Sequence, residues 1–152
     1  PSKCRFFLWT AVLGKILTAD ALLRRGWENN YFCPLCERNL ETPTHLLLDC
    51  PWSRYAWEKI AQLTHTPALL PASWDGLGSI KAWLVACHGK AREDRKKGTL
   101  SIIQLMSWEI WRERNRRIFQ QEYLGRERFI EKAREEIRLW NMAGAGIPFD
   151  PG

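Results

Sequence analysis

The chain of 152 residues lacks any apolar run near the roughly 20 residues that a membrane-spanning helix needs, so we expect no membrane partner. It also lacks internal repeats and low-complexity tracts, which leaves no sign of a repeat architecture. Its five cysteines are an odd number, whereas a secreted disulfide scaffold ordinarily uses an even one. These absences favour an intracellular protein of a reducing compartment, in the nucleus or the cytoplasm.

Motifs that carry catalysis are missing as well. The sequence has no Tyr-x-Asp-Asp polymerase motif, no clustered carboxylates for two metal ions, no glycine-rich phosphate loop and no Ser/His/Asp set. The aspartates are scattered along the chain. We therefore expect a non-catalytic chain without a small-molecule substrate. Because it begins at Pro1 and not at a methionine, we also expect it to be part of a longer protein.

Hydrophobic residues and positive charge are plentiful by comparison. Hydrophobic residues make up 45% of the chain, enough for a core, and nine tryptophans supply large rings for that core or for an interface. The formal net charge is +6. Residues 1–89 carry nine basic and seven acidic side chains, whereas residues 90–138 carry 14 basic and nine acidic ones. This basic second half suggests a polyanionic partner, although a helix face that is simply solvated has the same signature.

Apolar residues recur at helical spacing through most of the chain, which predicts a mostly α fold. Thr18 can cap a short helix that ends near Gly26. Thr42 and Pro43 predict another helix start, because proline at the first helical position loses no hydrogen bond. The predicted helices cover about 6–13, 18–26, 43–49, 51–63, 80–88, 99–122 and 126–141. A short hairpin is expected around residues 33–36.

Three cysteines and one histidine fall within 18 residues, as Cys33, Cys36, His45 and Cys50. Two cysteines separated by two residues bring two thiolates to one metal, and Pro34 restricts the loop between them. His45 lies in the first turn of a short helix and Cys50 just past its end, so both can face that loop. The spacing predicts one Zn²⁺ held by these four residues, in a closed structural site without a position for a catalytic water.

Spacing alone leaves three other interpretations of this stretch open. A redox Cys-x-x-Cys pair ordinarily opens a helix after a strand, and that context is not visible here. It would also leave His45 and Cys50 unexplained. A structural disulfide and unrelated buried cysteines are the other two. With zinc as the favoured interpretation, we expect a zinc-binding domain over 1–64, then a loop, short helix and charged connector over 65–98, and a C-terminal helical extension over 99–152.

Several short segments together resemble one known family. They are FFLW at 6–9, LLRRG at 22–26, CPLC at 33–36, ETPTHLLLDC at 41–50 and SRYAW at 53–57. In them the chain resembles the reverse-transcriptase zinc-binding domain of non-LTR (LINE-type) retrotransposon polyproteins, which are abundant in plant genomes. WEIWRERNRRIF at 108–119 resembles a segment that often follows that domain. The resemblance implies the same four zinc ligands within a mostly helical domain. Family members often have glycine after the second cysteine, where this chain has Glu37.

Two functions fit these observations. The first is a module that helps the polyprotein hold RNA or DNA without sequence specificity. Its candidate contacts are Lys96, Lys97, Arg112, Arg114, Arg116 and Arg117. The same arginines can instead pair with Glu109 and Glu113. The second is an interaction module that docks onto other parts of the polyprotein or onto a host partner through exposed tryptophans. A continuous basic face would favour the first function, and a contiguous apolar patch the second.

Overall fold

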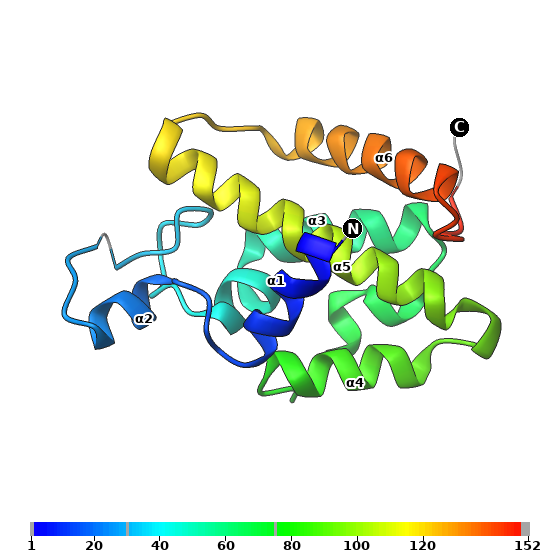
Figure 1. The fold of residues 1–152 in the computed structure, drawn as a ribbon, viewed down its shortest axis with the longest axis horizontal. Helices are drawn as coiled ribbons and strands as arrows, with labels where there is room; N and C mark the ends of the chain where they lie inside the picture. The colour runs from blue at the N-terminus through cyan, green and yellow to red at the C-terminus, as the bar shows by residue number, and fades with distance from the viewer. Residues whose placement is uncertain (1, 30, 75, 150–152) are drawn as a thin grey trace.

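The computed structural model describes residues 2–29, 31–74 and 76–149, and within these ranges it is helical and has no strand (Figure 1). The α-helices are α1 (Ser2–Val12), α2 (Ala19–Arg24), α3 (Pro51–Leu63), α4 (Ile80–Lys90), α5 (Lys96–Asn115) and α6 (Arg126–Met142). Shorter helical turns are η1 (His45–Asp49), η2 (Pro67–Leu69), η3 (Pro71–Ser73), η4 (Glu93–Arg95) and η5 (Arg116–Gln120). The predicted mostly α class is confirmed for this part of the chain. None of its helices is long and apolar enough to cross a membrane.

Helix α5 lies at the centre of the fold and packs against α1, α4, α6 and η1 (Figure 1). Its buried apolar side chains recur at helical spacing, at Ile102, Ile103, Leu105, Met106 and Ile110. The core around it is one cluster that includes Phe7 of α1, Trp83 of α4 and Phe129 of α6. Residues from all three predicted segments thus share one core. The segment limits at 64 and 98 stay a prediction.

Three tryptophans form an edge-to-face cluster inside this core. The ring centroids of Trp57, Trp74 and Trp83 lie 5.2 to 5.8 Å apart. Each such ring pair contributes about 0.5–1.5 kcal/mol beyond the area that it buries. The indole N–H of Trp57 donates to the carbonyl oxygen of Leu47 at 2.8 Å. Because Leu47 belongs to η1, this hydrogen bond ties η1 to α3.

The hairpin expected around residues 33–36 is not formed. The described chain there has a single antiparallel bridge, between Phe32 and Leu40, and no strand on either side. Tyr31 and Glu37 adopt left-handed backbone angles, with φ of 66° and 60°. A left-handed residue interrupts the extended conformation that a strand ladder requires, so the segment forms a tight turn instead of a hairpin.

One of the two predicted helix caps is wrong. The Thr18 side chain makes no capping hydrogen bond at the start of α2. The carboxylate of Glu41 takes its place, and its Oε1 accepts from the main-chain N–H of Ala19 at 2.9 Å. The other cap is formed, because Thr42 Oγ1 accepts from the main-chain N–H of His45 at 3.0 Å. This second cap involves His45, one of the predicted metal ligands.

Candidate metal centre

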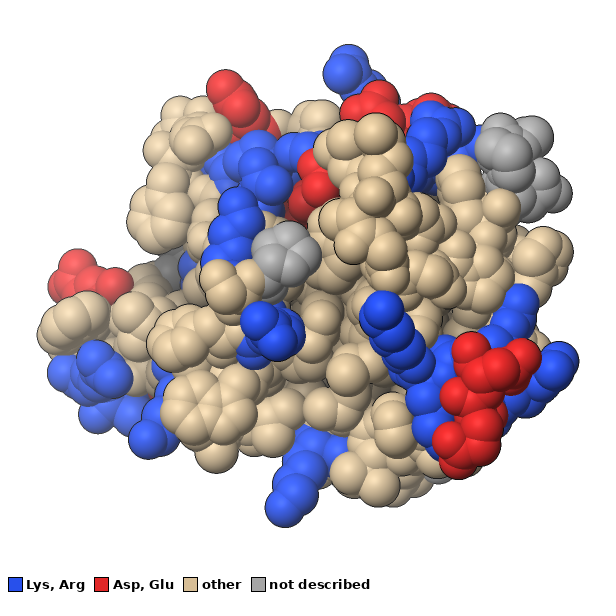
Figure 2. Space-filling view, turned by 45° about the vertical axis from the view of Figure 1, so that its right-hand side comes forward, with Lys and Arg blue, Asp and Glu red and all other residues tan. Residues whose placement is uncertain are grey.

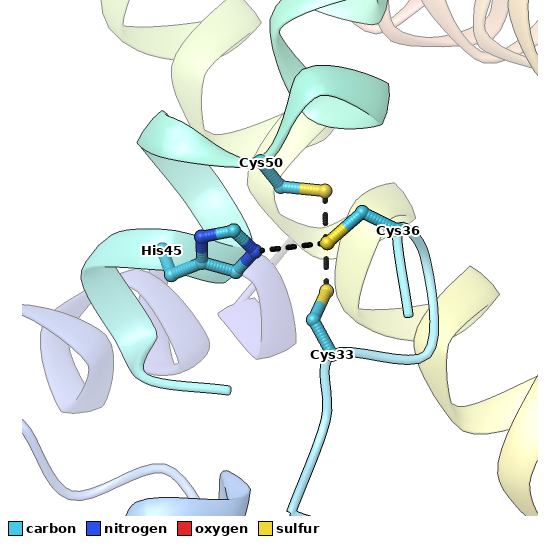
Figure 3. A group of neighbouring side chains, drawn as sticks. All are labelled: Cys33, Cys36, His45 and Cys50. Carbon is cyan, nitrogen blue, oxygen red and sulfur yellow. Dashed lines mark hydrogen bonds between the residues drawn. The ribbon is translucent and has the colours of Figure 1, made fainter. Parts of the chain in front are cut away.

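The four predicted ligands meet between the 33–36 loop and η1 (Figure 3). The loop supplies Cys33 and Cys36, whereas His45 begins η1 and Cys50 follows its last residue. Their donor atoms all lie within 4.8 Å of one another. Among the described residues, no other group of three or more His, Cys, Asp or Glu side chains is placed to hold a metal ion.

Two distances within this group lie close to those of a zinc tetrahedron. With Zn–S near 2.3 Å and Zn–N near 2.0–2.1 Å, two sulfurs lie about 3.8 Å apart, and a sulfur and a nitrogen about 3.6 Å apart. Cys33 Sγ and Cys50 Sγ are 3.9 Å apart, and Cys36 Sγ and His45 Nε2 are 3.3 Å apart. Three thiols and an imidazole are also ligands that zinc prefers. The Cys3His group therefore fits one Zn²⁺ with no coordination position to spare.

A π-helical turn aligns the last two ligands. In an α-helix, residues five apart point about 140° away from each other. Here the main-chain N–H of Cys50 donates to the carbonyl oxygen of His45 at 2.7 Å, which closes the wider turn of a π-helix. The turn is held in place by Leu46, Leu47 and Leu48, which are all buried. The wider turn brings the two ligand side chains to the same side.

The ligands also perturb one another's pKa. A hydrogen bond to Cys50, together with burial, raises the pKa of Cys33 to about 12. The same hydrogen bond lowers the pKa of Cys50, against the effect of burial. Hydrogen bonding to Cys33 raises the pKa of His45 to about 9. Zinc binds thiolate and neutral imidazole, so its binding displaces the protons that these groups carry.

The family of this domain follows from the same stretch of chain. Residues 1–57 match the family described as zinc-binding in reverse transcriptase. The match contains all four ligands and ends within α3. The resemblance to the reverse-transcriptase zinc-binding domain is thereby confirmed for residues 1–57. No curated protein and no solved structure matches the chain.

An arginine that contacts residues 1–57, the part that matches this family, lies outside them in α5. Arg114 is 5% exposed and forms a two-pronged ion pair with Glu41, with Nε–Oε2 at 2.8 Å and Nη2–Oε1 at 2.7 Å. Its Nη2 also donates to the carbonyl oxygen of Leu17 at 3.1 Å. Because Glu41 also caps α2, this one buried ion pair connects three parts of the fold. They are α5, α2 and the segment that precedes η1.

A second ion-paired group lies at the end of α5. Glu113 is fully buried and accepts from Arg116 at 2.8 Å and from Arg117 at 2.8 Å. Arg117 also donates to the carbonyl oxygen of Pro34, between the first two ligands, at 3.1 Å. Through this contact η5, which directly follows α5, supports the ligand loop of the zinc-binding domain from outside.

The six residues predicted to contact nucleic acid thus lie in two places. Lys96 and Lys97 begin α5, at the opposite end from the zinc-binding domain's ligands. The four arginines lie at or beyond the C-terminal end of α5 and have carboxylate partners; Arg112 pairs with Glu109 at 3.3 Å. The alternative pairing of arginines with Glu109 and Glu113 is confirmed for Arg112, Arg116 and Arg117. Their contact with nucleic acid stays a prediction.

Sequence reasoning missed Glu41 as a structural residue. The available signal was the position of this acidic residue directly before the Thr-Pro helix start. Its ion-pair partner, Arg114, could not be found in this way because it lies 73 residues away in the chain. The ion pair also borders an apolar groove of about 500 Å³ beside the ligand loop. Trp27, Tyr31, Phe32 and Trp111 are among the residues that line this groove.

Proposed function

We propose that this zinc-binding domain is a structural, non-catalytic module of a plant-type, non-LTR (LINE-type) retrotransposon polyprotein. We propose further that it helps the reverse transcriptase hold RNA or DNA, in the nucleus or the cytoplasm. The family match over residues 1–57 and the closed set of four ligands support the structural part. Other parts of the polyprotein are then its natural neighbours. A group of cations between α4 and α5 supports the part that concerns nucleic acid.

We call this group the basic corner. It consists of Lys90, Arg92, Arg95, Lys96 and Lys97. Segment 90–97 has two acidic residues against these five, a net charge of +3. Lys96 Nζ donates to the carbonyl oxygen of His88 at 2.7 Å, and Lys97 Nζ to that of Gly144 at 3.0 Å. A carbonyl does not neutralise the ammonium charge, and each lysine keeps two further N–H donors for a phosphate.

The arginines of α5 and η5 make a weaker case. Arg114, Arg116 and Arg117 are largely buried and already donate to carboxylates. On the face in Figure 2, Lys and Arg side chains form separate groups with tan surface between them. We therefore expect binding that is modest, non-specific and sensitive to salt, with the basic corner at its centre.

Replacement of two lysines tests this proposal. The variant Lys96→Ala with Lys97→Ala is expected to weaken binding of single-stranded RNA. The slope of log affinity against log salt concentration should fall by about 1.4, which is about 0.7 for each phosphate contact. Lys59→Ala with Lys81→Ala removes two exposed lysines elsewhere and is the matched control. Fluorescence anisotropy over a salt series measures both. An equal loss in the two variants, or no loss, contradicts a role for the basic corner.

A second candidate function is docking onto a protein, within the polyprotein or from the host. The specific observation that favours it is a row of exposed apolar side chains on α1 and the turn after it. Phe6, Trp9 and Leu13 are 64%, 59% and 47% exposed. An exposed apolar row of this kind is more typical of a contact surface than of a free helix.

A further inference from the structure

Helix α1 and the turn after it are apolar on two opposite faces. The inner face packs against α5, and the ring of Phe7 stacks on that of Trp111 with centroids 5.4 Å apart. The buried side chains of this face are Cys4, Phe7, Leu8 and Ala11. We call Phe6, Trp9 and Leu13 the outer stripe; they follow one another at intervals of three and four residues. In Figure 1, α1 lies in front of α5 with no other helix over it. A surface helix of a globular protein ordinarily has one apolar face, turned toward the core, so a second apolar face is unusual.

The outer stripe is large for a surface feature. The rings of Phe6 and Trp9 lie side by side, with centroids 6.1 Å apart. An aromatic side chain buries about 150–250 Å² when it is enclosed, so two rings at these exposures leave roughly 180–300 Å² uncovered. With Leu13 added, the stripe approaches the size of the largest apolar patches on monomers, which are often functional.

Cations alone flank the outer stripe along the chain. Residues 1–19 include Lys3, Arg5 and Lys15 and contain neither aspartate nor glutamate. The next acidic residue, Asp20, already pairs with Arg24 at 3.1 Å. Lys3 leans over the ring of Trp108, with its Nζ 5.7 Å from the ring centroid, whereas Arg5 and Lys15 are exposed. The segment that carries the outer stripe is therefore positively charged, which favours a partner of opposite charge.

We propose that the outer stripe docks an amphipathic helix of a partner protein whose own apolar stripe is bordered by aspartate or glutamate. This proposal rests on the docking candidate above and is independent of the basic corner. Intervals of three and four residues are those with which one helix packs against another. A second copy of the chain would set the same three cations against each other, which opposes self-association.

Nucleic acid fits the outer stripe less well than a helix does. Base stacking needs a flat aromatic face for each base. The ring planes of Phe6 and Trp9 are tilted by 46°, and the third member, Leu13, is aliphatic. The stripe therefore offers a ridge for packing instead of a platform for stacked bases.

A designed peptide tests the proposal directly. The probe is an amphipathic helix with leucines on one face bordered by glutamates, and its counterpart has lysines in place of the glutamates. The full chain should bind the acidic helix and not the basic one. Phe6→Ser with Trp9→Ser should weaken binding by about tenfold or more, because aromatic anchors dominate such contacts. Val85→Ser with Met142→Ser, which are 63% and 84% exposed, is the matched control and should bind normally.

Several results would overturn the proposal. They are no binding of the acidic helix, equal binding of both helices, or an equal loss in the control variant. If the native chain binds single-stranded RNA and the Phe6→Ser, Trp9→Ser variant does not, the outer stripe is a nucleic-acid site instead. If the native chain forms a dimer that the variant does not form, the stripe binds a second copy of the chain instead. Zinc content and melting temperature establish that each variant is folded. If the Lys96→Ala, Lys97→Ala variant binds RNA as the native chain does, only the proposal on nucleic acid fails, and the docking proposal is unaffected.

Discussion

Removal of Arg114 is expected to be far more damaging than loss of an exposed arginine. Among the described residues, Arg114→Ala leaves the carboxylate of Glu41, which is 1% exposed, with a single neutral donor, the main-chain N–H of Ala19. It also removes a donor from the carbonyl oxygen of Leu17. A buried charge without its counter-ion is costly, because it has lost its hydration without gaining a partner.

The magnitude follows from comparable sites. Breaking a buried ion pair from one side costs about 3–5 kcal/mol, a large share of the roughly 5–15 kcal/mol that holds a typical domain folded. For a chain of this length, that corresponds to a melting temperature roughly 6–20 °C lower. Arg92→Ala is the control. It breaks a pair with Asp94 whose side chains are 78% and 67% exposed, and should cost about 0–1 kcal/mol.

Urea unfolding with zinc in excess measures both variants. A double-mutant cycle with Glu41→Gln isolates the ion pair, because the neutral amide no longer demands a cation. We expect Arg114→Ala to cost much less in the Glu41→Gln background than in the native one. The reasoning is refuted if Arg114→Ala costs under about 1 kcal/mol, or if the two substitutions are additive.

Three further predictions concern the metal site and the core. Cys36→Ser should abolish zinc binding and cooperative unfolding, because zinc contributes on the order of 10 kcal/mol to folding in small sites. Elemental mass spectrometry and a thermal melt with and without chelator measure both effects. A variant that is folded without metal would contradict the prediction. Glu37→Gly should raise stability to urea by up to about 1 kcal/mol, because Glu37 has φ of 60°, where glycine is unstrained; a clear loss would be the opposite result. Burial raises the pKa of Glu109, so folding favours its neutral form. The contribution of Glu109 to the free energy of unfolding is therefore most favourable in acid, and it falls as the pH rises past the ordinary pKa of about 4.3. Glu109→Gln should therefore unfold at higher urea than the native chain at pH 7, with the difference shrinking toward pH 4; a difference that does not change with pH would count against this.

The metal ligands could be predicted because their arrangement is local. Cys33, Cys36, His45 and Cys50 lie within 18 residues, and a turn plus a short helix is enough to bring them together. Helix positions followed in the same way from apolar periodicity. The shape of the ligand loop did not follow, because the left-handed angle at Glu37 replaced the expected hairpin with a tighter turn. The π-helical turn that aligns the last two ligands also has no clear sequence signal.

The amino-acid sequence by itself thus determined the main helices, the members of the Cys3His group and the family match of residues 1–57, because each depends on residues near one another in the chain. Only the tertiary structure decided the role of the arginines in α5 and η5. The same run of positive charge would be solvated on an exposed helix. Here Arg114 reaches Glu41 across 73 residues, and Arg117 reaches Pro34 across 83. Such pairs form when α5 packs against the ligand loop and excludes water, and no local pattern encodes that packing.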